Sequence, residues 1–458
     1  MSLSAAQVFA ALNAVRPPDE PSPFIDKAVV LGGSVAGLLA ARVLADHAAG
    51  VVVIDRDDLH LPGPRPGVPQ GTQLHALLPG GFLHLERLFP GFRRLALAQG
   101  AIEAPPAARR TYLDGRLKVV VPDDADSLAG SRPLLEGLIR QQVLRLPNVK
   151  TVTARATGLL IEGDRATGVQ YEVGGRPGVE QADLVVDAMG RSSRLSDWLE
   201  QAGWERPAMR RMNVQLNYAT VVFRRRQDDP EHTVVMALNS YRRSPEVAGA
   251  AFFAIEEGRW MAMMAGYADN RPGRTPEDFL RRLREQFPPE FREVADSELL
   301  GEVQTYRHGD SRRRDFHTLR RFPAGLVPVG DAVASFNPVY GQGITAAALH
   351  AACLSTYLRP GPDLRQPARE FLALQQVVVD AAWSMSTSAD LALPHVDGPY
   401  PRGYRLSSWV SRQIVNATIT DIATARRFNE VVSMREHPDS LATPGVILGA
   451  LRANLRAR

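Results

Sequence analysis

The chain has 458 residues, of which 45% are hydrophobic, enough for two packed regions and an appendage. The formal net charge is +4, but only three of the 54 basic residues are lysines. The arginine clusters 224–226 and 312–314 are short, and Asp310 and Asp315 flank the second. We therefore expect both clusters to be solvated surface, and we expect no nucleic-acid site.

Targeting and membrane signals are absent from the sequence. No stretch approaches the roughly 18 uninterrupted apolar residues that a membrane span needs. Residues 1–24 contain acids and prolines that a signal peptide lacks, so we expect an N-terminal arm. A mobile arm is the favoured prediction, and a small docking helix is the alternative. The single Cys353 excludes an internal disulfide and predicts a buried thiol in a reducing compartment, and we expect a cytoplasmic protein.

A dinucleotide-binding pattern opens the folded part of the chain. Residues 28–31 predict a buried parallel strand, 32–37 (Gly-Gly-Ser-Val-Ala-Gly) a tight turn, and 38–45 a helix. The second strand, 51–55, ends in Asp55, placed to bind an adenosine ribose. The middle glycine of the usual fingerprint is Ser34, whose hydroxyl could itself reach a phosphate.

The middle of the chain predicts a capped helix and then a change to strands. Ser131 precedes a helix that starts near Arg132, and strands follow at 149–154 and 168–173 around a Gly163–Asp164 turn. Residues 182–187 form a strand that leads into a Gly-Arg-Ser-Ser turn at Gly190. Strand-like runs at 213–223, 233–238, 249–255 and 260–267 predict one curved sheet, and 276–287 an amphipathic helix.

The most informative segment is 326–349. An apolar strand leads to Gly330-Asp331, where a carboxylate at the carboxyl end of the strand can accept hydrogen bonds from ribityl or ribose hydroxyls. Pro338 ends the turn, and Gly341-Gln342-Gly343 opens a helix that continues from Ile344. The free N–H groups and positive end of that helix suit the electron-rich edge of a flavin. Two glycine motifs about 300 residues apart favour FAD over NAD, because FAD uses both ends of such a fold.

These segments, in this order, resemble the FAD-dependent monooxygenases of the para-hydroxybenzoate hydroxylase fold. Within that fold the chain is most similar to bacterial polyketide (polyether-type) epoxidases, and the resemblance runs from about residue 27 to about residue 390. It rests on six separated motifs: 32–38, Ile54-Asp-Arg-Asp57, Gly67-Val-Pro-Gln70, Ser131-Arg-Pro-Leu-Leu135, Glu257-Gly-Arg-Trp260 and Phe336-Asn-Pro-Val-Tyr340.

The resemblance implies an α/β fold with a Rossmann-like FAD-binding domain of the glutathione-reductase type, a β-sheet substrate domain and a C-terminal helical region. We expect the FAD-binding domain at 25–90, 130–200 and 305–360, the substrate domain at 91–129 and 201–304, and the helical region at 361–458. The cofactor residues implied are Gly32, Ser34, Val35, Ala36, Gly37, Asp55, Arg56, Arg132, Gly190, Asp331, Pro338, Gly341, Gln342, Gly343 and Ile344.

The sheet of the substrate domain would roof the flavin in this fold. Candidates for substrate contact are Tyr218, Phe253, Met261, Met263 and Phe336, although alternation alone does not separate a pocket wall from a core face. No catalytic residue can be assigned, and the polar candidates are His75 and Asn337. The histidines show no metal-ligand spacing, so we expect no metal site.

Two departures from the family pattern leave alternatives open. Met189 replaces the aspartate of the fold's Asp-Gly motif, and Thr72-Gln-Leu-His75 keeps only the last residue of an Arg-His-x-His pattern. The Trp-x-Trp pair of flavin halogenases is absent.

We expect a monooxygenase that uses O2 and is reduced by NAD(P)H, which binds transiently, or by a partner flavin reductase. It would transfer one oxygen atom through a flavin C4a-hydroperoxide to a hydrophobic polyketide-like molecule of secondary metabolism. The alternatives are a redox-neutral FAD-containing cyclase or isomerase and, less favoured, a flavin dehydrogenase or ene-reductase.

Overall fold

A five-stranded parallel sheet brings the predicted cofactor segments to one edge. The computed structural model describes residues 3–226, 231–239 and 248–457. The strand order is β19 (Leu326–Pro328), β11 (Leu184–Asp187), β1 (Ile25–Leu31), β2 (Ala48–Asp55) and β7 (Val149–Thr153). Leu31 pairs with both Asp187 and Ile54, so these strands end together. The segments that follow β1, β2, β11 and β19 therefore meet at the same carboxyl edge.

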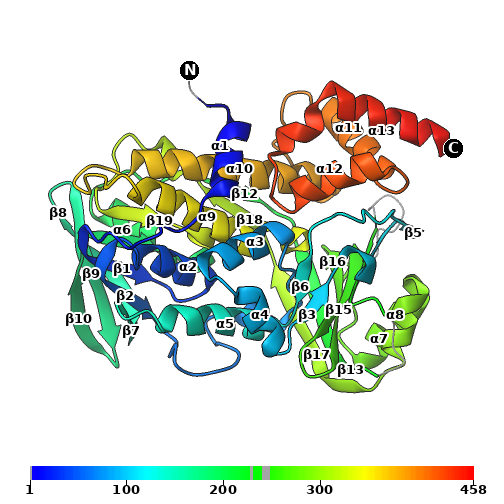
Figure 1. Cartoon of the computed structure of the whole chain (residues 1–458), viewed down its shortest axis with the longest axis horizontal. Helices are drawn as coiled ribbons and strands as arrows, with labels where there is room; N and C mark the ends of the chain where they lie inside the picture. Colours follow the sequence, from blue (N-terminus) through cyan, green and yellow to red (C-terminus); the bar gives the residue numbers. More distant parts are fainter. Residues whose placement is uncertain (1–2, 227–230, 240–247, 458) are drawn as a thin grey trace.

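Helices pack around this sheet, which explains why its strands are apolar on both faces. Helix α2 contacts α9 and α5, and α9 also contacts α3 and α10 (Figure 1). Small residues along α9 allow this close packing, and Cys353 within it is fully buried, as the sequence predicts. The bounds are α2 (Val35–Leu44), α3 (Pro79–Leu88), α4 (Phe92–Ala98), α5 (Arg132–Leu144), α6 (Leu195–Gln201), α9 (Gly343–Leu358) and α10 (Arg369–Asp390).

The four consecutive strands β7 to β10 divide between two sheets. Of these four, only β7 joins the parallel sheet. A separate antiparallel sheet contains β8 (Arg155–Glu162), β9 (Arg165–Val173) and β10 (Arg176–Gln181), and the predicted Gly163–Asp164 turn joins β8 to β9.

The predicted curved sheet has seven strands. Its order is β17 (Leu299–His308), β13 (Leu216–Arg224), β16 (Arg259–Tyr267), β15 (Gly249–Ile255), β14 (Val234–Leu238), β4 (Arg109–Leu113) and β5 (Arg116–Leu117). The outer face is covered by α7 (Pro276–Gln286) and α8 (Pro289–Ala295), where Phe252 packs edge-on against Phe291 and Trp260 (Figure 1). The opposite, inner face carries four of the five predicted substrate residues.

Short strands join the two large sheets. One small sheet pairs β12 (Met209–Met212) with β18 (Ser311–Arg314) and β18 with β20 (Ala334–Ser335). Another pairs β3 (Ile102–Ala104) with β6 (Ser127–Ala129).

The favoured prediction of a mobile N-terminal arm is wrong for residues 5–14. They form helix α1 (Ala5–Ala14), which a capping box between Ser4 and Gln7 starts. Phe9 and Leu12 are buried, and α1 contacts α9 and α10. The short apolar-periodic run therefore forms a docked helix, because its apolar face finds a partner surface on the C-terminal half of the chain.

The C-terminal region is helical, with a break between α10 and Tyr404 that contains Pro394 and Pro399. It continues as α11 (Tyr404–Ala417), α12 (Ile422–Val432) and α13 (Pro444–Arg456), which Figure 1 shows above the seven-stranded sheet. Ile414, Val431 and Ala450 form the centre of its small core. Within the described ranges, no helix has both the length and the apolar composition of a membrane span.

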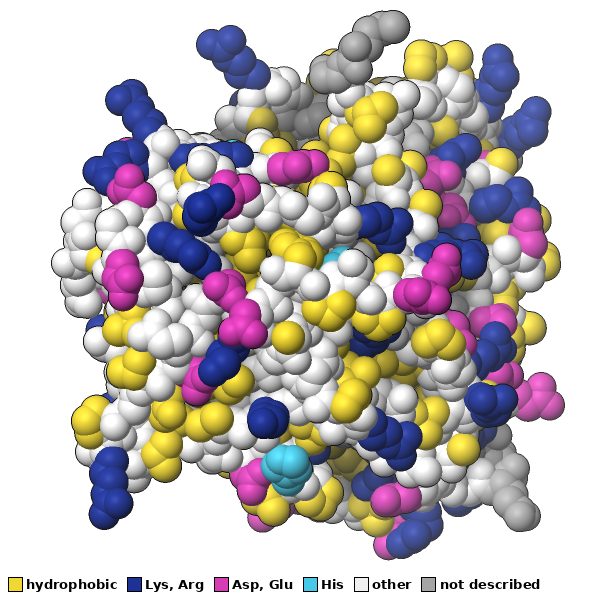
Figure 2. Space-filling view, turned by 60° about the vertical axis from the view of Figure 1, so that its left-hand side comes forward, with side chains coloured by type: hydrophobic (Ala, Val, Ile, Leu, Met, Phe, Trp, Pro, Cys, Tyr) yellow, Lys and Arg dark blue, Asp and Glu magenta, His cyan; other side chains and the backbone are white. Residues whose placement is uncertain are grey.

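The two arginine clusters differ in the structure. Arg224 is exposed and paired with Glu298, as expected of a solvated surface, and Figure 2 shows basic and acidic side chains interspersed on one face. In the second cluster the prediction is wrong, because Arg313 and Arg314 are only 3% and 4% exposed. Arg313 pairs with Asp315, and Arg314 donates to backbone carbonyls, including that of Ala332. This cluster therefore supports the loop that carries Asp331.

Candidate functional site

The turn between β1 and α2 requires glycine at two positions. Gly32 has φ +104°, and a Cβ there would lie 2.5 Å from the Ala188 carbonyl oxygen. A Cβ on Gly37 would lie 1.8 Å from the Gly32 carbonyl oxygen. Ser34 is the N-cap of α2, but its hydroxyl makes no capping bond and turns instead toward α5. The turn thus brings backbone N–H groups and the start of α2, with Val35 and Ala36, to the carboxyl edge of the sheet.

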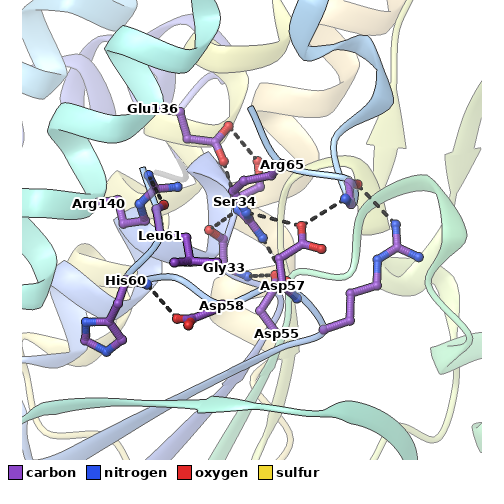
Figure 3. Close-up of polar contacts among 12 residues, drawn as sticks. Gly33, Ser34, Asp55, Asp57, Asp58, His60, Leu61, Arg65, Glu136 and Arg140 are labelled. Carbon is purple, nitrogen blue, oxygen red and sulfur yellow. Dashed lines mark hydrogen bonds and ion pairs between the residues drawn. The ribbon is translucent and has the colours of Figure 1, made fainter. Parts of the chain in front are cut away.

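Asp55 closes this turn from β2. Its Oδ2 accepts a hydrogen bond from the Gly33 N–H at 2.6 Å, and its Oδ1 accepts one from the Asp57 N–H at 2.8 Å (Figure 3). Arg56, between them, points away: its side chain is exposed and donates to the Gly67 carbonyl. Of the adjacent pair, Asp55 reaches the turn and Arg56 does not.

Arg65 is the centre of the polar network in Figure 3. Its guanidinium pairs with Asp55 at 2.7 Å, Asp57 at 3.3 Å and Glu136 at 2.9 Å. It also donates to the Gly33 carbonyl at 2.6 Å. Burial alone would lower the Arg65 pKa, but these carboxylates raise it above its usual value. Sequence reasoning missed Arg65, although it lies just before the Gly67–Gln70 motif and eight residues after Asp57.

Arg132 approaches the same turn from α5. Ser131 caps the helix by accepting from the Leu134 N–H, which fixes Arg132 in its first turn. Arg132 donates to Glu136 at 2.8 Å and to the Ser34 hydroxyl at 3.2 Å. Burial alone would raise the pKa of Glu136, but Arg132 and Arg65 hold that pKa below its usual value. Two guanidinium groups thus flank the Gly33–Ser34 turn, an arrangement that could hold a pyrophosphate.

The second glycine motif meets the first across the sheet edge. Gly330 has φ +60°, and a Cβ there would lie 2.5 Å from Ala36 Cβ, so this approach also requires glycine. The Gly330 N–H donates to His350 Nδ1 at 2.8 Å. A Cβ on Gly190 would lie 4.0 Å from Asp331 Cβ. The three segments singled out in the sequence therefore converge.

Asp331 is half-buried, and neighbouring groups compensate the charge of its carboxyl. Burial raises the pKa of its carboxyl, while Arg191 and the Ser335 hydroxyl oppose that shift. Arg191 donates to Ser335 and pairs with Asp310, so it is fixed beside the loop. A carboxylate so placed can accept hydrogen bonds from hydroxyl groups of a bound molecule.

The loop after Asp331 ends at the start of α9. Pro338 begins a short 3-10 turn, η6 (Pro338–Tyr340), and Gly341 follows with φ +67°. The Gln342 Oε1 and Thr345 Oγ1 atoms are buried without a hydrogen-bond partner among the described residues. Gly343 is exposed, and a Cβ on it would meet no atom within 4 Å. Together with Ile344, the helix start presents free N–H groups to open space, as a flavin ring would need.

The residues present fit FAD at both ends. The Gly32–Gly37 turn with Asp55, Arg65 and Arg132 could hold the adenosine ribose and the pyrophosphate. Asp331 and the Gly341–Gly343 helix start could hold the ribityl chain and the flavin ring. Among the described residues, no group of three histidine, cysteine, aspartate or glutamate side chains could hold a metal ion.

Four of the five predicted substrate residues share the inner face of the seven-stranded sheet. Met261 pairs with Phe253 and Val222, and Met263 with Ala251 and Thr220, so these side chains project to one side with Tyr218. The exception is Phe336, which is buried in the main core around the parallel sheet.

The two polar candidates occupy different places. His75 is half-buried; its Nδ1 donates to the Gln73 carbonyl at 2.8 Å, and burial lowers its pKa to about 4, so it is neutral at pH 7. Arg132 contributes to that shift, which puts His75 beside the network at α5. Asn337 is fully buried, and its side chain accepts from the Val339 N–H and donates to Asp390 and Tyr267. Its amide is therefore engaged within the protein.

Comparisons with known proteins agree with this architecture. No protein-family model matches the chain. The structure is similar to that of the flavin-dependent brominase Bmp2, with a TM-score of 0.65 and 16% identity over 94% of this chain and 99% of the other. It is also similar to p-nitrophenol 4-monooxygenase PnpA of Pseudomonas putida DLL-E4, with a TM-score of 0.62 and 17% identity over 91% and 99% of the two chains.

These likenesses show that the chain shares the α/β fold of these two proteins, which combines a parallel sheet between helices, a second large sheet and C-terminal helices. In sequence, the chain is 32% identical over 449 residues to protein Rv3254 of Mycobacterium tuberculosis H37Rv, covering 94% of each protein. With so high a coverage at this identity, the chain belongs to the same family as Rv3254.

Proposed function

We propose that this protein is an FAD-dependent monooxygenase that inserts one oxygen atom from O2 into a hydrophobic, polyketide-like small molecule by epoxidation or hydroxylation. The observation that carries the proposal is the convergence of Ala36, Gly190 and Gly330–Asp331 at one sheet edge. The names of two proteins of similar fold, a flavin-dependent brominase and a p-nitrophenol monooxygenase, support flavin-based oxidation.

Each part of the proposed site has a separate task. Reduced flavin, when bound, supplies the electrons that activate O2, with NAD(P)H or a partner reductase as the source. Arg132 would attract the pyrophosphate, Arg65 would hold Asp55 and the Gly33–Ser34 turn in place, and Asp331 would orient the ribityl chain. The N–H groups at Gly343 would stabilise negative charge on the reduced ring. The inner sheet face, with Phe253, Met261 and Met263, would bind an apolar substrate and exclude water.

The cofactor assignment is tested by purification and by one substitution. We expect yellow protein that contains FAD, and Asp331→Ala should bind FAD roughly 10- to 100-fold more weakly, because a charged acceptor is lost. The matched control is Asp164→Ala, an exposed acid on the β8–β9 turn whose pairing with Arg321 is on the surface. A colourless wild type that cannot be reconstituted with FAD would overturn the assignment.

The reaction type is tested with 5-deaza-FAD, which has nearly the same shape as FAD but does not support oxygen transfer. Binding should be preserved and product formation lost, and strict anaerobiosis should have the same effect. A redox-neutral cyclase or isomerase would be indifferent to both changes. Full turnover with the deaza cofactor would therefore exclude the monooxygenase and favour that alternative.

A further inference from the structure

A buried polar cluster lies at the end of α10, outside the proposed cofactor contacts. We call Asp390, Asn337, Tyr340, Tyr267 and Tyr218 the Asp390 cluster. Asp390 and Asn337 are both 0% exposed. Asp390 Oδ1 accepts from Asn337 Nδ2 at 2.8 Å and from the Tyr340 hydroxyl at 2.9 Å, and Asn337 Nδ2 also lies 3.2 Å from the Tyr267 hydroxyl. One carboxylate oxygen is thus fully occupied.

Two polar atoms of the cluster have no such partner. Among the described residues, neither Asp390 Oδ2 nor the Tyr218 hydroxyl makes a hydrogen bond, although both are buried. The Ser386 hydroxyl, one helical turn before Asp390, lies near enough to the carboxyl to lower its pKa as a donor would, but it does not reach full hydrogen-bond geometry. Buried polar atoms are rarely left unpaired, and one that persists calls for an explanation such as a ligand.

The cluster stands where the proposed substrate surface meets the proposed flavin loop. Tyr218 and Tyr267 belong to β13 and β16 and project from the inner face of the seven-stranded sheet, since Leu216, two residues from Tyr218, pairs with Tyr267. Asn337 and Tyr340 belong to the loop between Asp331 and Gly343. Tyr218 packs with Leu391 and Leu393, which directly follow α10, and Met263 of the same sheet face packs against this hydrophobic cluster. The two unpaired atoms therefore lie where the end of α10 meets the inner face.

Building on the proposed function, we propose that the Asp390 cluster recognises a hydroxyl group of the substrate. Asp390 Oδ2 accepts the hydrogen bond of that hydroxyl, and Tyr218 is the second polar contact. The substrate is then an apolar molecule with a hydroxyl at one end, not a hydrocarbon chain without polar groups. Asp390 and Tyr218 are specificity and positioning residues that hold the far end of the molecule and set which carbon faces the flavin.

The groups around Asp390 make this recognition depend on pH. They are Ser386 on its own helix, Tyr218, Tyr267 and Tyr340 from the elements packed against it, and, farther out, Tyr306 on β17 and His395, whose ring lies 6.0 Å from that of Tyr267. No arginine or lysine is among the groups that shift the Asp390 pKa, which burial raises to about 6. Burial also raises the pKa of all three cluster tyrosines, so they stay protonated at pH 7. Asp390 is therefore a full acceptor only above about pH 6.

The test compares two probes that differ in one hydrogen-bond donor. 2-Naphthol donates a hydrogen bond, whereas 2-methoxynaphthalene has the same ring system and does not. Binding to FAD-loaded protein is measured by calorimetry and by perturbation of the flavin spectrum. Wild type should bind 2-naphthol at least about 10-fold more tightly at pH 7.5, and this preference should shrink below pH 6.

Asp390→Asn keeps the shape and the Oδ1 acceptor but places an NH2 group where Oδ2 was. It should abolish the preference without changing the affinity for 2-methoxynaphthalene, and Tyr218→Phe should reduce the preference. Asp164→Asn, an exposed acid on the β8–β9 turn, is the matched control and should leave both affinities unchanged. A purely structural Asp390 would alter both probes alike and would give no pH-dependent ratio.

Equal affinities in wild type, an unchanged preference in Asp390→Asn, or no binding of 2-naphthol up to its solubility limit would each overturn the inference. The proposed function fails separately. A preference for 2-naphthol with no O2-dependent oxidation of any substrate would sink the monooxygenase and leave the hydroxyl site standing.

Discussion

Asp55 Oδ1 and Arg65 Nη2 lie 2.7 Å apart, directly beside the Gly33 N–H that bonds to the other oxygen of the same carboxylate. The residue expected to bind the adenosine ribose is thus held in place by Arg65, which also binds the Gly33 carbonyl of the glycine turn. Asp57 and Glu136 complete the set around Arg65, so three carboxylates share one guanidinium. The charge of this corner depends on Arg65.

Removing Arg65 should therefore destabilise the protein even without cofactor. Arg65→Ala leaves three largely buried carboxylates without their shared cation, and the loss of unfolding free energy should be about 3–5 kcal/mol. Arg65 is one of the two arginines that lower the Glu136 pKa, so in its absence that pKa rises and the loss should shrink as the pH falls and Glu136 takes up a proton. Thermal unfolding across pH measures both effects. Arg56→Ala, an exposed neighbour, should change neither, and equal effects of the two variants would refute the role of Arg65.

His350 should position Asp331 through its hydrogen bond to the preceding residue, Gly330. Its Nδ1 accepts the Gly330 N–H, and burial lowers its pKa to about 3, so it stays neutral at physiological pH. His350→Ala leaves that buried N–H unpaired and opens a cavity, and we expect both lower stability, by about 2–4 kcal/mol, and weaker FAD binding.

His350→Asn offers an amide oxygen near the former Nδ1 and should recover part of the FAD affinity. Because His350 does not titrate in this range, the difference between variants should be the same from pH 5 to pH 9. Flavin fluorescence titrations measure it, and a pH-dependent difference would contradict the neutral acceptor.

Gly343→Ala should separate folding from cofactor binding. The added Cβ meets no protein atom within 4 Å, and alanine in a helix lowers the entropy of the unfolded chain, so the FAD-free protein should be stabilised by about 0.4–1 kcal/mol. The same methyl group would project into the space proposed for the flavin ring, and FAD affinity should fall at least about 10-fold, a loss of roughly 1.4 kcal/mol.

The control is Gly445→Ala in the first turn of α13, where an added Cβ also meets nothing within 4 Å. It should be equally benign for folding and should leave FAD binding unchanged. Undiminished FAD affinity in Gly343→Ala would mean that the flavin ring lies elsewhere.

Asp390 should make the protein less stable at neutral pH than under mildly acidic conditions. Its folded pKa of about 6 lies above the unfolded value near 3.9, so the native state binds the extra proton. Its contribution therefore declines as pH rises from about 4 to 6 and stays low above that, by at most about 3 kcal/mol for two pKa units. Asp390→Asn should remove this slope and raise the melting temperature at pH 8 more than at pH 5. An unchanged slope would show that burial does not raise the pKa of this carboxyl.

The sequence by itself determined those features of the fold and of the candidate site that depend on a particular residue within a local pattern. The glycines at 32, 37, 330 and 341 were visible because their backbone positions tolerate no side chain or need positive φ, and the strand and helix periods around them are local. The strands of the curved sheet and the Ser131-capped helix could be predicted from the sequence for the same reason.

Only the tertiary structure decided which polar side chains meet. Arg65 and Glu136 are 71 residues apart, and Asn337 and Asp390 are 53 apart, so no local pattern marks either pair. The packing of the chain likewise buries Arg313 and Arg314 but leaves Arg224 exposed. It also provides the surface of α9 and α10 against which α1 packs. Contacts and solvation depend on what the rest of the chain brings alongside a residue, and they decide which charges are paired, which stay neutral and which buried atoms remain available for a ligand.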